Sequence, residues 1–248
     1  GERRALLLKA ADALEAKTPQ FIDAVSAETG ATGMWAGFNV MLAAGMIREA
    51  ASLTTQVAGE VIPSDVPGSL AMGVRQPAGV VLGIAPWNAP VILGVRAIAT
   101  PLACGNTVIL KGSENCPRTH QLIVEAFQDA GFPPGVVNYL TNAPADAGAV
   151  VEAMVAHPAV RRVNFTGSTK VGRIIAMTCA KYLKPVVLEL GGKAPLVILD
   201  DADLDDAVNA AAFGCFANSG QICMSTERIV VDQKIADAFV KKFVDKAK

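Results

Sequence analysis

Five short segments carry polar side chains directly after apolar runs, and these side chains can bind or react with small molecules. In open α/β sheets, ligands bind where strands end and helices begin, so such segments are the first places to look for a site. They are residues 85–90 (APWNAP), 110–114 (LKGSE), 165–169 (FTGST), 188–193 (LELGGK) and 220–225 (GQICMS).

Three of the segments hold side chains suited to acyl chemistry. Asn88 can donate to a developing oxyanion without adding charge, or it can form an Asx turn before a helix. Cys223 lies in a polar, Gly-containing loop where a thiol could act as a nucleophile, although most lone cysteines are small buried hydrophobic residues. Glu189 ends an apolar strand, which predicts a raised pKa useful to a general base unless a neighbouring lysine pairs with it.

The other two segments favour nucleotide binding. Glu114 can accept both hydroxyls of a ribose, and Lys111 can reach the same sugar or a phosphate, although a surface ion pair is the simpler alternative. Gly167 and Ser168 precede a predicted helix, whose N-terminal N–H groups can bind a pyrophosphate. The alternative is that Ser168 is an ordinary helix cap, which would have the same sequence pattern. A carboxylate on the ribose repels the 2′-phosphate of NADP, so Glu114 predicts NAD as the cofactor.

Between these motifs, short runs rich in Val and Ile alternate with helical patterns. This alternation is typical of βαβ units and predicts an α/β fold with a doubly wound parallel sheet. The expected strands are 79–85, 107–110, 136–140, 162–166, 186–190, 195–199 and 228–231. The expected helices are 91–103, 117–130, 145–156, 170–182, one from 203 and one over 234–248.

Four regions follow from these patterns. Residues 1–58 should form two or three packed helices, and 59–77 have the composition of a β-hairpin arm that needs a partner surface. Residues 78–190 should form a cofactor-binding domain, and 191–248 the beginning of a second α/β domain. Because the chain starts and stops inside helical patterns, we expect a fragment of a longer protein.

Composition narrows the classes of partner. The 22 basic and 23 acidic residues give a net charge of -1 and form no basic stripe, which argues against nucleic acid. The apolar runs are far shorter than the ~20 residues of a membrane span, and no signal peptide is visible. Five cysteines without a C-x-x-C pair predict neither disulfides nor a metal site, and favour a reducing cytoplasm.

The five motifs, in this order, resemble those of the aldehyde dehydrogenase superfamily over residues 77–228. The resemblance implies a Rossmann-like fold that does without the G-x-G-x-x-G fingerprint, which is also missing from 141–148 here. It implies Cys223 as nucleophile, Glu189 as the base that activates water, and Asn88 with the Cys223 N–H as oxyanion donors, without a metal. The cofactor-binding residues it implies are Ile84, Ala85, Pro86, Trp87, Lys111, Glu114, Phe165, Gly167, Ser168, Val171, Leu190 and Gly191.

Residues 28–44 and 87–114 are most similar to bacterial salicylaldehyde and related aromatic aldehyde dehydrogenases. That resemblance implies a small aromatic aldehyde as substrate, with Trp35, Leu93 and Arg96 lining its pocket. In the alternative, Trp35 and Leu93 are helix packing and Arg96 is a solvated or ion-paired side chain. The arm implies a homodimer or homotetramer.

Two other functions fit parts of the pattern. A CoA-acylating or phosphorylating relative would resolve the thioester with another acceptor, but Glu189 as a hydrolytic base argues against it. A catalytically silent binding or structural protein would keep the fold and the arm for assembly. Intact Cys223, Glu189 and Asn88 argue against that reading.

Overall fold

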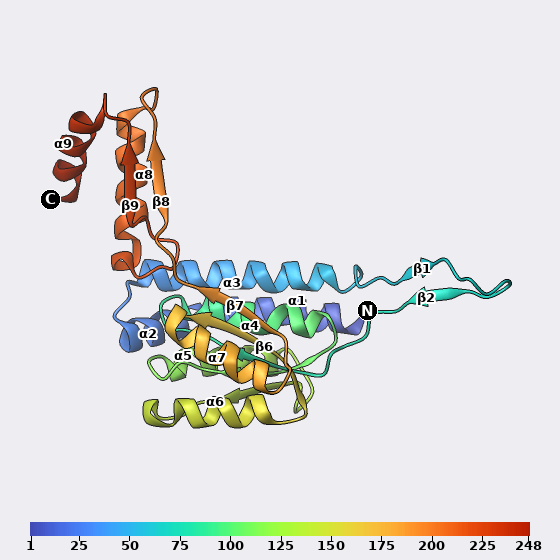
Figure 1. The fold of residues 1–248 in the computed structure, drawn as a ribbon. Helices are drawn as coiled ribbons and strands as arrows, with labels where there is room; N and C mark the ends of the chain where they lie inside the picture. Colours follow the sequence, from blue (N-terminus) through green and yellow to red (C-terminus); the bar gives the residue numbers. More distant parts are fainter. The chain divides into compact units, whose positions relative to one another are not determined.

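A computed structural model describes all 248 residues (Figure 1). The chain forms two compact units, residues 1–189 and residues 190–248, and each is described by itself. No helix in either unit is long and apolar enough to cross a membrane.

Three helices begin the first unit, as the sequence predicted: α1 (Glu2–Ala16), α2 (Thr18–Thr29) and α3 (Gly33–Leu53). Apolar residues three or four positions apart face inward, and many of them are alanines. Small side chains allow close approach, and α1 and α3 lie alongside each other (Figure 1).

The predicted arm is an antiparallel hairpin of β1 (Glu60–Ile62) and β2 (Ala71–Gly73), with Val61 opposite Met72. It extends away from the helices and sheet of its own unit (Figure 1). Val61 is 71% exposed and Met72 58% exposed, so the hairpin buries almost no apolar surface within the chain.

The centre of the unit is a five-stranded sheet in the order β5-β4-β3-β6-β7. Strand β3 pairs in parallel with β4 and β6, and β4 with β5, which confirms the predicted doubly wound sheet. The chain winds outward from β3 to β5 and returns to β6, so the order reverses between β3 and β6. The strands are β3 (Val80–Ile84), β4 (Thr107–Lys111), β5 (Val137–Leu140), β6 (Val160–Gly167) and β7 (Val186–Leu190).

Four helices connect these strands. Helices α4 and α5 pack together and against the N-terminal helices, while α6 and α7 pack against each other and against β6. The expected helix at 145–156 is instead a short 3-10 turn, η1 (Pro144–Asp146), followed by α6, because Pro144 shapes its first turn. The helices are α4 (Pro90–Ala103), α5 (Pro117–Asp129), α6 (Ala147–Ala156) and α7 (Thr169–Lys181).

The second unit pairs β8 (Pro195–Ile198) in parallel with β9 (Arg228–Val231). A small core of Ile198, Val208, Ala211 and Phe239 joins the strands to the helices. The helical elements are α8 (Leu204–Phe216), η2 (Ala217–Gly220) and α9 (Ala236–Ala247).

One long-range contact fixes where α5 begins. The Glu28 carboxylate, at the end of α2, accepts hydrogen bonds from the Arg118 N–H at 2.7 Å, the Thr119 N–H at 2.9 Å and the Thr119 hydroxyl at 2.6 Å. The N-cap residue Cys116 makes no side-chain cap of its own. Glu28 therefore supplies both the cap and the negative charge that a helix N-terminus favours.

We predict that Glu28→Ala lowers the free energy of unfolding by about 1–2 kcal/mol, because it leaves helix N–H groups without their acceptor. The measurement is chemical denaturation of the full-length protein. Glu49→Ala, an exposed glutamate of α3, is the matched control and should change stability by less than about 0.5 kcal/mol. Equal losses in the two variants would show that Glu28 is not a cap.

Candidate functional site

Three of the five predicted motifs meet at the carboxyl edge of the sheet. Ile84, the last residue of β3, lies opposite Lys111 on β4 and Phe165 on β6. The segments that follow therefore leave neighbouring strands side by side, at the point where the strand order reverses. In this architecture that crevice is where a nucleotide or similar ligand binds.

The loop after β4 holds an ionised carboxylate. Glu114 pairs with Lys111, whose side chain is almost fully buried, so the pair is not the surface ion pair considered as the alternative. Glu114 Oε1 also accepts from the Asn142 side chain at 3.0 Å. Burial raises the pKa of Glu114, but the hydrogen bonds from Lys111, its own backbone and Asn142 outweigh burial and lower the pKa below its ordinary value.

The loop after β6 turns directly into a helix. Ser168 caps α7 by accepting from the Val171 N–H at 3.3 Å, which is the ordinary cap considered as an alternative. A Cβ on Gly167 would lie 2.5 Å from the ring of Phe165, so only glycine fits above that buried ring. Because α7 follows β6 directly, its N-terminus lies at the carboxyl end of β6, next to the end of β3.

Side chains of α3 form hydrogen bonds with the loop after β3 and with the start of α4. The Trp35 indole donates to the backbone carbonyl of Asn88 at 2.9 Å, and the buried Asn39 amide spans from the Trp35 carbonyl (2.9 Å) to the Ile92 N–H (3.5 Å). Trp35 also packs against a buried cluster that includes Leu93. Both residues therefore have packing roles here, and their part in a substrate pocket stays a prediction.

Arg96 and Glu189 line one cavity of about 640 Å³ in the first unit, together with Arg162 and Asn164. The Arg96 guanidinium donates to the Thr166 hydroxyl at 3.4 Å, so it is hydrogen-bonded and not ion-paired. Within this unit the Glu189 side chain is exposed, although it lies at the end of an apolar strand, and its role as a general base stays a prediction. Successive side chains of a strand point to opposite faces of the sheet, and on β7, the edge strand, the face that carries Glu189 is exposed.

The remaining residues predicted to contact the cofactor fall into four groups. Ile84 and Ala85 are buried under the crevice, Pro86 and Trp87 are half-buried, and Val171 is exposed on α7. Leu190 and Gly191 follow in the second unit.

Beneath the edge of the sheet lies His120, a fully buried residue of α5. Its Nδ1 accepts from the Ser113 N–H at 3.0 Å, and its Nε2 lies 3.2 Å from the Pro90 carbonyl oxygen. A backbone N–H can only donate and a carbonyl can only accept, so the proton of the neutral ring is on Nε2. Burial is the main cause that lowers the pKa of His120 to about 4, and the charge of Lys111 adds to it.

Cys223 lies in a turn of the second unit and is the one exposed thiol among the five free cysteines. The Ser225 N–H donates to the Ile222 carbonyl at 2.9 Å and closes the turn. Just ahead, Asn218, Ser219 and Gly220 all have left-handed backbone angles, with φ of 48°, 57° and 72°. Such strain in non-glycine residues is concentrated at functional sites.

Cys116 shows the opposite environment. It is fully buried beside His120, and burial raises the pKa of its thiol to about 12. A thiol with that pKa holds essentially no thiolate at neutral pH, so it is not a nucleophile.

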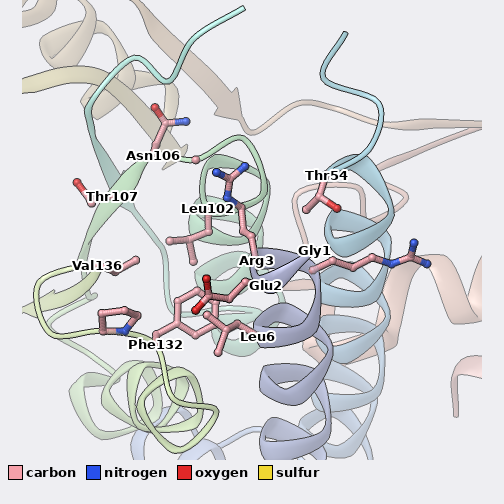
Figure 2. Close-up of a pocket in the computed structure, with 13 residues that line it drawn as sticks. Gly1, Glu2, Arg3, Leu6, Thr54, Leu102, Asn106, Thr107, Phe132 and Val136 are labelled. Atoms are coloured by element: carbon pink, nitrogen blue, oxygen red, sulfur yellow. The ribbon is translucent and has the colours of Figure 1, made fainter.

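A separate cavity of about 550 Å³ lies where α1 begins (Figure 2). Two of its polar residues have structural partners: Arg3 donates to the Ala103 carbonyl, and Asn106 accepts from the Ala78 and Gly79 N–H groups. None of the predicted site residues lines it. No group of three or more His, Cys, Asp or Glu side chains is arranged to hold a metal ion.

Residues 1–248 match the model of the aldehyde dehydrogenase family over their whole length. The chain belongs to this family. It is 67% identical over 245 residues to a vanillin dehydrogenase of Pseudomonas fluorescens, covering 99% of this chain and 51% of that protein. The chain thus spans about half the length of the curated relatives it matches.

Solved structures of the family agree with the fold. The chain is similar to a salicylaldehyde dehydrogenase from Pseudomonas putida G7 complexed with salicylaldehyde, with a TM-score of 0.96, 56% identity and coverage of 99% of this chain and 51% of that one. It is also similar to PnpE of Pseudomonas sp. WBC-3 in complex with nicotinamide adenine dinucleotide, with a TM-score of 0.93, 37% identity and coverage of 100% and 50%. The predicted family and fold class are confirmed.

Sequence reasoning missed three polar residues of this aldehyde dehydrogenase family member: Asn39, His120 and Asn142. Asn39 and His120 stand inside helical patterns, where a polar residue normally faces solvent. Each stands among apolar residues on the helix face that packs against the core, and this position indicates a buried, hydrogen-bonded polar side chain. Asn142 lies in the loop 141–148, whose ligand contacts the sequence left open.

The pKa of His120 gives a prediction about stability. Below its ordinary pKa of 6.5 the unfolded chain takes up a proton on this ring, whereas the folded chain does so only near pH 4. The stabilisation is therefore complete above about pH 6.5 and is lost as the pH falls to about 4, by about 3 kcal/mol. Lys111, Glu114 and Cys116 are the other ionisable groups beside the ring.

The measurement is denaturation of the full-length protein between pH 4 and 7.5, with and without His120→Gln. The parent should lose more stability than the variant across this range. Parallel pH dependence in the two proteins would contradict a buried neutral His120.

Proposed function

We propose that this chain is the cofactor-binding half, with the cysteine loop, of an enzyme that oxidises an aromatic aldehyde to its carboxylic acid with NAD. Membership of the aldehyde dehydrogenase family supports the reaction class. The observation that carries the proposal is Cys223, the exposed thiol on a turn that follows three left-handed residues. All five cysteines are free, as in the reducing cytoplasm that we propose for the whole protein.

In the first step the Cys223 thiolate adds to the aldehyde carbon, and a C–S bond forms as the carbonyl π bond becomes an oxyanion. The Asn88 side chain and the Cys223 N–H stabilise that oxyanion by donating hydrogen bonds. Collapse of the oxyanion expels a hydride from the former aldehyde carbon and leaves a thioester on Cys223. When bound, NAD supplies the acceptor of this hydride.

In the second step Glu189 takes a proton from water while the water oxygen attacks the thioester carbon. The C–S bond breaks, Cys223 returns to its thiolate form, and the carboxylic acid leaves. The exposure of Glu189 in the first unit leaves its carboxylate accessible to a water molecule.

The first unit offers groups that fit NAD. The ionised Glu114 stands at the crevice and can accept ribose hydroxyls, and the N-terminus of α7 can bind a pyrophosphate. Beside Glu114, Asn142 Oδ1 is a buried oxygen that lacks a hydrogen-bond partner, as expected of a site shaped for a ligand donor. Lys111, Gly167 and Ser168 complete the proposed set.

The proposed substrate class is a small aromatic aldehyde. The supporting relatives are named for vanillin and salicylaldehyde. Trp35 and Leu93 would provide the apolar wall, and Arg96 would meet a ring hydroxyl or phenolate after exchanging its bond with Thr166.

We also propose that the protein is a homodimer or homotetramer that uses the hairpin of β1 and β2 to extend a sheet of another subunit. The exposed apolar side chains and unpaired outer edges of this hairpin support the proposal.

We predict that Cys223→Ala abolishes NADH formation, with a loss of at least about 10³-fold, because no other thiol can form the thioester. The assay follows NADH absorbance in the full-length protein with salicylaldehyde, benzaldehyde and a short aliphatic aldehyde. The aromatic aldehydes should give the higher kcat/KM.

Cys179→Ala is the matched control, because Cys179 is buried in α7. It should retain activity. Undiminished turnover by Cys223→Ala would overturn the mechanism, and a preference for the aliphatic aldehyde would overturn the substrate class.

A second prediction concerns the choice of cofactor. Glu114→Gln should raise the ratio of kcat/KM with NADP to kcat/KM with NAD by about tenfold or more, because it removes the negative charge that repels a 2′-phosphate. Glu152→Gln, an exposed glutamate paired with Lys181, is the control and should leave the ratio unchanged. A Glu114→Gln protein that still rejects NADP would show that another feature excludes it.

A further inference from the structure

Two loops of the proposed site are joined by one buried side chain. His120 binds the Ser113 N–H in the loop that carries Glu114, and it donates to the Pro90 carbonyl, two residues beyond Asn88. We propose that His120 is a positioning residue that holds the ribose-binding loop and the oxyanion loop in one fixed arrangement. This inference rests on the proposed function, and it adds a residue to the machinery of that function.

The backbone around the ring is shaped to admit it. A Cβ on Gly94, in the first turns of α4, would lie 2.5 Å from Ile123 Cδ1 and 3.1 Å from His120 Cδ2. A Cβ on Gly112 would lie 2.8 Å from the Tyr139 ring and 3.1 Å from His120 Nδ1. Glycine on both sides lets the imidazole sit between α4 and the end of β4. The ring therefore occupies a built slot between the two loops.

The slot is also firmly anchored. Helix α5, which carries His120, begins at the Glu28 cap, and the Tyr139 hydroxyl donates to the Pro117 carbonyl at 2.7 Å. His120 is 0% exposed, so both of its hydrogen bonds are shielded from water. Water does not compete for a shielded hydrogen bond, so such a bond fixes the positions of its two partners more firmly than an exposed one.

The two ring nitrogens can be tested separately. An asparagine amide can reach the place of Nδ1, so His120→Asn keeps an acceptor for Ser113 and loses the donor to Pro90. A glutamine amide can reach the place of Nε2, so His120→Gln keeps a donor to Pro90 and loses the acceptor for Ser113. Each variant thus releases one loop and leaves the other held.

The experiment is steady-state kinetics of the full-length protein with NAD and benzaldehyde. His120→Gln should raise the KM and Kd for NAD roughly tenfold with kcat within about threefold of the parent, because the loop of Glu114 is loosened. His120→Asn should lower kcat roughly tenfold with the Kd for NAD within about threefold, because the loop of Asn88 is loosened. His157→Gln, at the only other histidine, is the control and should match the parent.

A residue that merely fills space would give a different pattern. The two variants would then lose thermal stability together, with kcat and KM changed alike or unchanged, and either result overturns the inference. If neither variant folds, hydrogen exchange in the parent decides: NAD should slow exchange at residues 88–93, beyond its proposed contacts at 84–87, as well as at 111–114. An unchanged exchange rate at 88–93 would overturn the coupling.

The outcome is separable from that of the proposed function. If the parent protein makes no NADH from any aldehyde, the proposed function fails. The Kd for NAD and the exchange at residues 88–93 would still decide whether His120 holds the two loops together.

Discussion

A parallel strand that ends in a ligand-binding loop loses the ladder hydrogen bonds that fixed its backbone, and this constraint governs the carboxyl edge of the sheet. Here buried side chains of helices supply hydrogen bonds to these loops and to the start of the next helix. His120 accepts from the Ser113 N–H, and Trp35 donates to the Asn88 carbonyl. In the first turn of α4, His120 donates to the Pro90 carbonyl and Asn39 accepts from the Ile92 N–H. The loops stay open toward a ligand because they are held from underneath.

This arrangement explains why the sheet comes with three additional helices. Helix α3 supplies Trp35 and Asn39, and α2 supplies Glu28, which fixes the start of the helix that carries His120. The N-terminal helices are therefore connected to the loops at the carboxyl edge of the sheet through only one or two side chains. A change in their packing would reach the loops without touching a ligand.

The order of elements could be predicted from sequence because local periodicity produces it: central strands covered on both faces are continuously apolar, and helices are amphipathic. The positions where the strands end could be predicted from the same periodicity, and so could the placement of Asn88, Glu114 and Ser168 after them. The supports under the loops could not be predicted in the same way, since Glu28 lies 91 residues from Thr119 and His120 30 residues from Pro90. The exposure of Glu189 within its unit could not be predicted either, because an apolar run does not reveal which strand lies at the edge of a sheet.

Two cysteines show how the fold gives the same thiol group different environments. Cys116 sits at a helix start, a position that lowers the pKa of an exposed thiol, yet burial prevails and raises its pKa to about 12. Cys223 is exposed on a turn that follows three left-handed residues. A helix N-terminus therefore does not make a reactive thiol where desolvation opposes the charge. Cys223 has the access to a reactant that burial denies to Cys116.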